Sequence, residues 1–223
     1  RLSSTAHNLP QRASMMLPRR AVGDAVQPVA GVWKAVIMTD APDALRSNAG
    51  SGKPVRDVDE VMVRPIHPDD AGEVLTVQRA AFVQEALIYR DPDMPALTQT
   101  LEELEAELAD NLGFVAGRRQ RIVGAIRAVA DGDLLLIGRI AIAPDQQGEG
   151  IGGMLLDAVE ERGWSVGCRE AELFTGSHSD ANVRLYTRRG YRETERVDQG
   201  DGTAQIFLRK QLRNDPSPGS SGA

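Results

Sequence analysis

The chain has 223 residues, 41% of them hydrophobic, and a formal net charge of −6. This length accommodates one ordinary domain with tails, or two small domains. The negative charge argues against general binding to nucleic acid or to an anionic membrane, because both would repel the protein. The single cysteine, Cys168, excludes an intrachain disulfide and a cysteine-based zinc cluster, which favours a cytoplasmic protein. No apolar run approaches the ~18 residues of a transmembrane helix.

The two ends of the chain differ in composition from its middle. Residues 1–58 lack sustained hydrophobic periodicity and contain "SNAGSGKPVRD", which is typical of a flexible linker. We therefore expect an N-terminal extension over 1–58 that is flexible or partly ordered. The tail over 214–223 has a disordered composition. The folded domain is predicted to span residues 59–213, an ordinary domain size.

The first half of this domain predicts a strand, two helices and three further strands. "EVMVRPI" is typical of a strand, and Asp69 or Asp70 can cap the helix that follows it. After the polar link "YRDPDMPALTQ", Thr100 and Glu103 form a capping box for a second helix. The strand-like runs are then "GFVAGR", "RIVGAIRAV" and "LLLIGRIAIA", with "DGD" as the turn between the last two.

The second half alternates between the same two periods. A helix over 151–162 is expected to bury Met154, Leu155 and Val159 and to stop at Gly163. The strand "EAELFTG" follows, then a short helix in "SDANVRLYTRRG", then the strands "YRETERV" and "TAQIFLRKQL". This order of elements predicts a mixed α/β (α+β) sheet domain.

The loop between "IAIAPDQ" and the helix over 151–162 is unusually rich in glycine, with Gly148, Gly150, Gly152 and Gly153 inside six residues. A strand that leads through glycines into a helix presents several backbone N–H groups at the positive end of a helix dipole. Glycine permits positive φ and lets the backbone approach phosphate oxygens closely. The loop therefore predicts a phosphate or pyrophosphate site.

Other interpretations of this loop compete. A nucleoside-triphosphate loop needs a lysine after the glycines, and Gly152-Gly153-Met154 has none, so this alternative is excluded. The dinucleotide pattern G-x-G-x-x-G is present from Gly148 to Gly153. However, residues 144–147 separate the strand from the first glycine, and the roughly 70 residues that remain are too few for the rest of a doubly wound sheet. A helix start that binds no ligand is the remaining alternative.

The pattern Gln147-x-x-Gly150-x-Gly152, placed after an apolar strand, resembles the signature of the GNAT superfamily of N-acetyltransferases. The resemblance covers residues 61–212 and includes the order of elements and "SHSDANVRLYTRRGY". It implies a mixed, mostly antiparallel central sheet that is splayed between its central strands and flanked by about four helices. It also implies acetyl-CoA as the acyl-donor substrate, with no metal. The residues that the resemblance assigns to coenzyme A are Ile142, Ala143, Gln147, Gly148, Gly150, Ile151, Gly152, Gly153 and Asn182.

Asn182 and Tyr186 lie four residues apart on a short helix and so share one face. The resemblance makes the asparagine a contact of the cofactor arm and Tyr186 the general acid that protonates the leaving thiolate. The alternative is a core tyrosine whose hydroxyl is satisfied within the protein. Tyr191 is expected to pack at the start of a strand.

The sequence does not identify a general base. The resemblance places a glutamate at the position of Gly138, next to Arg139, where this chain has no carboxylate; Gly138 itself fits a bulge. The other candidates for the base are Glu85, Asp91, Asp93, Glu172 and His178, and none is preferred. Asp91 and Asp93 would suit a cationic amine, but they are equally suited to form turns.

Two hypotheses about function follow. The first is an acetyl-CoA-dependent N-acetyltransferase that acts on a primary amine of a small molecule by direct attack. The second is a non-catalytic acyl-CoA-binding or regulatory domain, favoured by the missing glutamate. The first predicts a small-molecule amine as partner, no nucleic-acid or membrane partner, and, from the resemblance alone, a homodimer.

Overall fold

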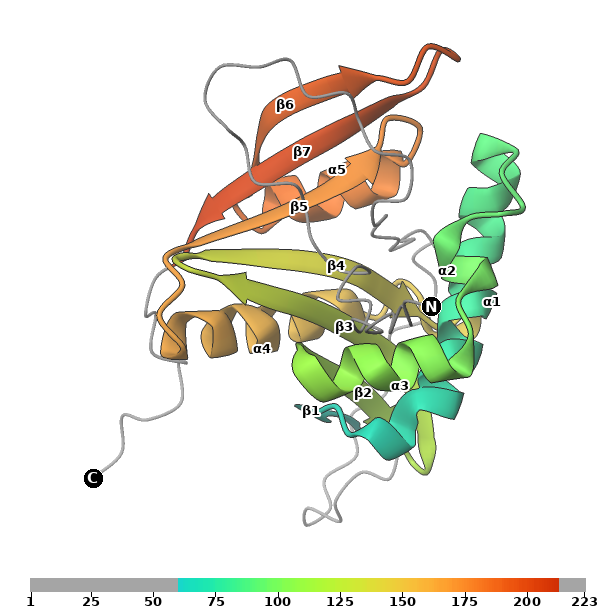
Figure 1. The fold of residues 1–223 in the computed structure, drawn as a ribbon, viewed down its shortest axis with the longest axis vertical. Coiled ribbons are helices and arrows are strands. Elements are labelled where there is room, and N and C mark those ends of the chain that lie inside the picture. The colour runs from blue at the N-terminus through green and yellow to red at the C-terminus, as the bar shows by residue number, and fades with distance from the viewer. Residues whose placement is uncertain (1–59, 213–223) are drawn as a thin grey trace, which may run out of the picture. The chain divides into compact units, whose positions relative to one another are not determined.

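The computed structural model describes residues 60–212, and the predicted extension over 1–58 and tail over 214–223 lie outside the described residues. One seven-stranded sheet has the order β1-β2-β3-β4-β5-β7-β6 (Figure 1). Its strands are β1 Val61–Pro65, β2 Leu112–Arg118, β3 Arg121–Asp131, β4 Leu134–Ile142, β5 Glu170–Gly176, β6 Arg192–Asp198 and β7 Ala204–Gln211. The helices are α1 Ala71–Tyr89, α2 Pro95–Thr98, α3 Leu101–Asp110, α4 Ile151–Ser165 and α5 Asp180–Arg188, with short 3-10 turns η1 Pro68–Asp70 and η2 Pro144–Gln146.

The sheet is antiparallel except between β4 and β5. These two central strands run parallel, and they pair only from Leu134 with Glu170 to Leu136 with Glu172. Beyond these pairs β4 continues to Ile142 and β5 to Gly176, and Figure 1 shows the two strands diverging. The predicted mixed, mostly antiparallel sheet with splayed central strands is confirmed.

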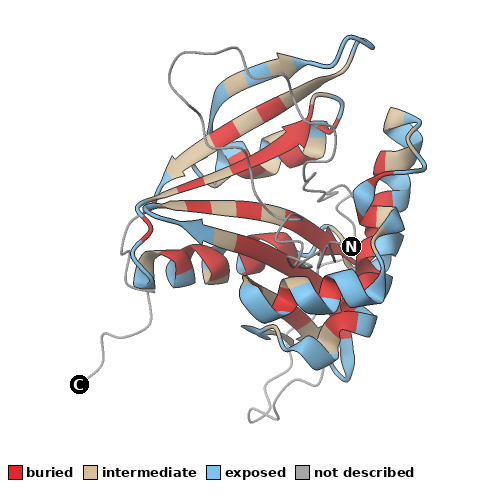
Figure 2. Ribbon diagram, in the orientation of Figure 1, coloured by how far each residue is buried: buried red, intermediate tan, exposed pale blue. Residues whose placement is uncertain are grey.

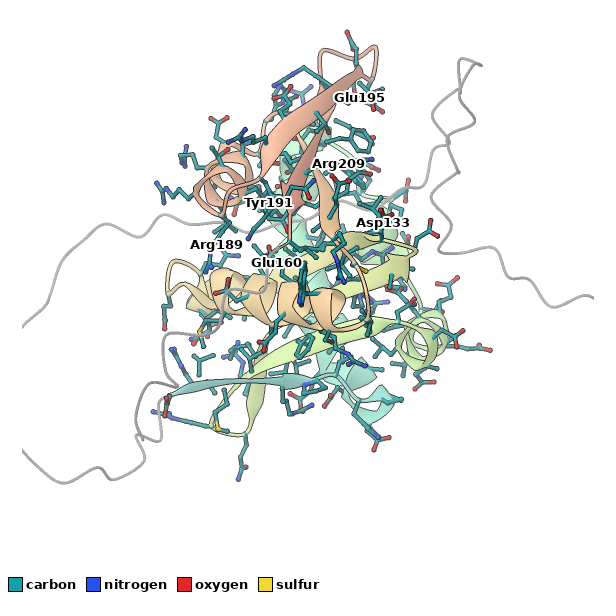
Figure 3. The ribbon with its side chains drawn as sticks, turned by 90° about the vertical axis from the view of Figure 1, so that its left-hand side faces the viewer. Asp133, Glu160, Arg189, Tyr191, Glu195 and Arg209 are labelled. Carbon is teal, nitrogen blue, oxygen red and sulfur yellow. The ribbon has the colours of Figure 1, made fainter. Side chains whose placement is uncertain are left out.

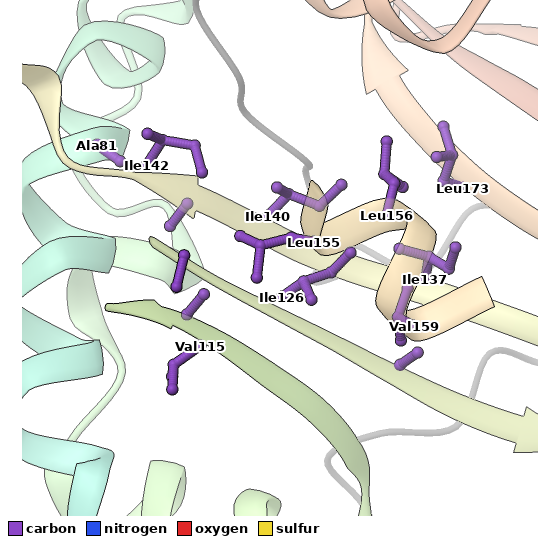
Figure 4. Close-up of a cluster of buried hydrophobic side chains, with 14 of the residues drawn as sticks. Ala81, Val115, Ile126, Ile137, Ile140, Ile142, Leu155, Leu156, Val159 and Leu173 are labelled. Carbon is purple, nitrogen blue, oxygen red and sulfur yellow. The ribbon is translucent and has the colours of Figure 1, made fainter. Parts of the chain in front are cut away.

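Helices cover both faces of the sheet. On β3, the missing side chain of Gly124 leaves room for Ile151 and Leu155 of α4. Arg127, three residues further along the same strand, contacts Gln78 of α1 and so points to the opposite face. Figure 2 shows buried residues along the strands and on the helix faces that meet them. Figure 4 shows part of the apolar core, where Leu155, Leu156 and Val159 of α4 meet the sheet.

The structure confirms the order of elements and corrects four local predictions. Asp70 stands at the N-cap of α1 but its side chain does not cap this helix, because the carboxylate binds the Arg64 guanidinium at 2.7 Å and accepts from the His67 amide at the start of η1. The link after α1 contains the one-turn helix α2, which was not predicted. Met154, expected to face inward, is 39% exposed. Gly163 does not end α4, which continues to Ser165, because Gly163 is a packing position against Leu135 of β4.

Candidate active site

The opening between β4 and β5 is bordered by backbone groups of β4. The amide of Ala143 donates to the carbonyl of Val123 on β3 at 2.8 Å. Because successive residues of a strand direct their backbone groups to opposite neighbours, the amide of Ile142 faces β5 and the opening. The side-chain amide of Gln147 donates to the carbonyl of Ile142 at 3.3 Å. Gln147 thus ties the glycine loop to the end of the strand.

The glycine loop has the conformation that its composition predicts. Gly148 and Gly150 have φ of 83° and 80°, in the left-handed region that favours glycine. Gly150 is the N-cap of α4, with no side-chain cap, and the first turn of α4 has no acidic residue. The amides of Gly153 and Met154 donate to the carbonyl of Gly150, whereas those of Ile151 and Gly152 precede the first hydrogen-bonded turn. The start of α4 therefore offers N–H donors and a positive dipole to an anion.

Arginines of the hairpin formed by β2 and β3 bind the glycine loop and the residues just before it. Arg118 donates to the side chain of Gln146 at 2.5 Å and also binds Glu149. Arg121 binds Asp145 through two contacts of 2.8 Å, and this guanidinium lowers the pKa of the Asp145 carboxyl to about 2. A surface hollow of about 460 Å³ lies here, lined by Arg118, Arg119, Arg121, Val123 and Gln146.

A cation lies beside the first turn of α4. The guanidinium of Arg189, which follows α5, occupies the space where a side chain on Gly153 would begin. It pairs with Asp157, one turn further along α4, at 2.5 Å. Figure 3 shows Arg189 directed from the end of α5 toward α4. The Arg189 guanidinium therefore lies beside the first turn of α4 as one half of an ion pair.

Tyr186 and Asn182 both lie on the buried face of α5, as their spacing predicts. The side-chain amide of Asn182 donates to the hydroxyl of Thr175 on β5 at 3.3 Å. Tyr186 has 0% exposure, and its hydroxyl has no hydrogen-bond partner among residues 60–212. Burial, and then the charge of Glu85, raise the pKa of Tyr186 far above its ordinary value. Tyr186 therefore holds a proton at neutral pH that nothing in this part of the chain accepts.

A buried carboxylate lies in the same region. Glu85 of α1 is 3% exposed, and its two oxygens accept from the Ser179 hydroxyl at 2.8 and 3.0 Å. The Tyr89 hydroxyl lies 3.2 Å from that of Ser179 and accepts from the amide of His178 at 2.9 Å. The rings of Tyr89 and His178 are stacked. The sequence analysis did not single out Tyr89 or Ser179 of this group, because neither belongs to a local sequence motif.

The other candidates for the base have structural contacts. Glu172 binds Arg209 at 2.5 Å. Asp91 accepts from the amide of Asp93 at 3.2 Å, which is a turn contact. Near Gly138 the sheet register shifts, and Arg139, with φ of 37°, takes the left-handed conformation. Arg139 is 7% exposed and binds Gln99. Its side chain therefore faces neither the solvent nor the glycine loop.

Two further expectations concern residues near the site. Tyr191 packs at the start of β6, and its hydroxyl donates to Glu160 at 2.8 Å. Cys168 is buried, and burial raises the pKa of its thiol, which disfavours a nucleophilic thiolate. Within residues 60–212 there is no cluster of three potential metal ligands, and no helix there is long and apolar enough to cross a membrane.

Comparison with known proteins identifies the family. The family model described as acetyltransferase (GNAT) family matches residues 80–191, half of the chain. The chain belongs to the GNAT acetyltransferase family. The prediction of an acyltransferase domain with this fold is thereby confirmed at the level of the family.

Individual relatives are distant. The UPF0157 protein YqkA of Bacillus subtilis is 27% identical over 132 residues, which are 59% of this chain and 37% of that protein. The IAA acetyltransferase of Azospirillum brasilense is 25% identical over 150 residues, 62% of this chain and 98% of that protein. The paia N-acetyltransferase of Thermoplasma acidophilum, solved in complex with coenzyme A, is 17% identical with a TM-score of 0.56 and covers 68% of this chain and 99% of its own. The matched residues are little more than a third of the Bacillus subtilis protein and nearly all of the Azospirillum brasilense protein.

Proposed function

We propose that this GNAT protein is an acetyl-CoA-dependent N-acetyltransferase that acts on a primary amine, that of a small molecule, by direct attack. The observation that carries the proposal is the buried Tyr186 hydroxyl, which belongs to the helix that follows β5 and has no acceptor among the described residues. A donor buried without a partner costs about 1–3 kcal/mol unless a ligand satisfies it. The sulfur of a bound thioester is an atom that can do so.

The residues along the opening fit coenzyme A. The loop amides from Gly148 to Gly152 and the dipole of α4 suit a pyrophosphate, whereas the predicted contact at Gly153 is corrected, because its amide donates to the carbonyl of Gly150. The amide of Ile142 suits the pantetheine arm, while Ala143 and Gln147 hold the strand end and the loop in place. Asn182 keeps α5, and with it Tyr186, against β5. From this arrangement we infer that these residues contact acetyl-CoA.

Acetyl-CoA, when bound, supplies an acetyl thioester that an amine attacks directly. Tyr186 donates its proton to the sulfur as the C–S bond breaks and the amide forms. Its raised pKa keeps the proton on the phenol until a thiolate develops. The buried Cys168 provides no covalent step in this scheme.

Binding is the first test. A thermal-shift comparison of acetyl-CoA, coenzyme A and NAD should show stabilisation by both coenzyme A forms and none by NAD. At about 100 times Kd, a ligand adds about 2.7 kcal/mol. A shift with NAD alone would contradict the proposal, and the absence of any shift would identify the loop as a simple helix start. Amine-dependent release of free thiol then separates an enzyme from the alternative, a non-catalytic acyl-CoA-binding domain.

Tyr186→Phe tests the acid. We expect kcat to fall by about 10² or more, with little change in acetyl-CoA affinity, because only the proton donor is lost. Tyr191→Phe is the matched control: it removes a buried phenol hydroxyl bound to Glu160 and should leave kcat nearly unchanged. Parental turnover in Tyr186→Phe over the whole pH range would show that the assignment is wrong. The homodimer and the cytoplasmic location stay predictions of the sequence.

A further inference from the structure

We propose that Glu85 is the catalytic residue that accepts the proton of the acceptor amine. This inference rests on the proposed acetyltransferase function and supplies the base that the sequence left unassigned. Glu85 belongs to α1, on the same face as Gln78 and Ala81, and this face is buried against the sheet.

The position of Glu85 is fixed by contacts between elements far apart in sequence. Ser179, at the start of α5, donates to both carboxylate oxygens of Glu85. Gly176, the last residue of β5, has no room for a side chain because the Tyr89 hydroxyl of α1 occupies that space. These contacts hold the carboxylate at the end of β5, where β5 has diverged from β4. The carboxylate therefore lies at the end of the site where β4 and β5 have separated, and not at the end where these strands are paired.

Glu85 and Tyr186 interact through their charges. The Glu85 carboxylate raises the pKa of Tyr186, in addition to burial. Among the described residues, the other titratable groups in this region are Tyr89 on the same helix, and His178 and Asp180 where α5 begins. Tyr89 also has a raised pKa, mainly from burial, so it stays neutral at neutral pH. Glu85 is the member of this cluster whose charge acts on Tyr186, and the ordinary pKa of a glutamate lies below neutrality.

The proton transfers balance. An ammonium group gives one proton to the Glu85 carboxylate, and the neutral amine forms the C–N bond. The attacking nitrogen releases its second proton to water as the C–S bond breaks and the amide forms. Tyr186 gives its proton to the sulfur, and Glu85 then passes the first amine proton to the Tyr186 phenolate, which restores both residues. Once Glu85 is protonated, its charge no longer opposes ionisation of Tyr186. Uptake of the first proton therefore makes Tyr186 a stronger acid when the thiolate leaves.

The test begins with the parent enzyme. A panel of aliphatic, aromatic and amino-acid amines is screened by thiol release, and the fastest amine is kept as the probe. If the parent binds acetyl-CoA but acetylates nothing, the proposed function fails before Glu85 is tested. With an active probe, Glu85→Gln should lower kcat/KM by about 10² or more and abolish the fall in rate at low pH, at unchanged acetyl-CoA affinity.

Glu160→Gln is the matched control, because Glu160 is also a buried glutamate that accepts from a hydroxyl, that of Tyr191. It should keep the parental pH profile whatever it does to stability. Ser179→Ala keeps the carboxylate and covers the case in which Glu85→Gln does not fold. Loss of the hydroxyl donor disfavours the charged carboxylate, so the low-pH limb should move to higher pH. A parental profile in both Glu85→Gln and Ser179→Ala, or in Ser179→Ala when Glu85→Gln does not fold, would overturn the inference.

Discussion

Two glycines of α4 lie against side chains of different mobility. A methyl group on Gly153 would meet the guanidinium of Arg189, the far end of a flexible and partly exposed side chain. A methyl group on Gly163 would lie 2.6 Å from Cδ2 of Leu135, which is fully buried. Arg189 can swing away, whereas Leu135 is confined by the core around it.

The two alanine substitutions should therefore differ in stability. Gly153→Ala gains up to about 1 kcal/mol of helix propensity and loses an exposed ion pair worth about as much, so we expect a free energy of unfolding within about 1 kcal/mol of the parent. Gly163→Ala gains the same propensity but overpacks the core, and we expect it to be less stable by about 1–2 kcal/mol. Urea unfolding of both variants measures this difference. Equal midpoints would contradict it.

At the scale of elements, β4 is paired on one side along its length and open on the other beyond Leu136. The amide of Ala143 is bonded to β3, whereas that of Ile142 faces the opening. If coenzyme A binds there, its arm should protect Ile142 selectively. We expect acetyl-CoA to slow hydrogen exchange of the Ile142 amide by about tenfold or more and to leave Ala143, the internal control, nearly unchanged. Residue-resolved exchange by NMR measures both, and equal slowing would argue against an arm bound along β4.

Hydrophobic periodicity was sufficient to predict the order of elements, because the long helices bury one face and most strands contain a run or an alternation of buried residues. It failed where a distant residue decides the local structure. The carboxylate of Asp70 binds Arg64 and the His67 amide and so does not cap α1, and Leu135 makes Gly163 a packing position instead of a stop. The one-turn helix α2 is too short to show a period.

The residues of the candidate site likewise include some that the local sequence predicts and others that it does not. The spacing of Asn182 and Tyr186 correctly predicted two residues on the buried face of α5, because both lie within one local element. The contact of Glu85 with Ser179 joins residues 94 positions apart, and only the packing of α1 on β5 and α5 creates it. A polar residue on the apolar face of α1, seven positions after Gln78, was the one local signal of a buried carboxylate.

For the whole molecule, the three tyrosines supply a test of the packing in alkali. Burial raises the pKa of Tyr89, Tyr186 and Tyr191 above the ordinary value near 10. The folded protein should therefore show at most the tyrosinate of the partly buried Tyr89 at about pH 10.5, where tyrosines of the unfolded chain are mostly ionised. The absorbance of Tyr186 and Tyr191 should appear together with the loss of circular dichroism. Two tyrosinates formed while the circular dichroism is intact would contradict the burial of Tyr186 and Tyr191.

The same pKa shifts determine how stability changes with pH. Above about pH 10 the unfolded chain has lost the protons that Tyr186 and Tyr191 retain when folded, so each residue lowers the free energy of unfolding by about 1.4 kcal/mol per pH unit. Arg127 acts in the opposite direction, because burial lowers its pKa from 12.5 to about 10 and the unfolded chain then binds the extra proton. Tyr191→Phe removes one of the two tyrosine contributions, so the slope of its urea-derived stability against pH should be less negative than that of the parent by about 1.4 kcal/mol per pH unit. A parental slope in Tyr191→Phe would mean that this tyrosine ionises in the folded state.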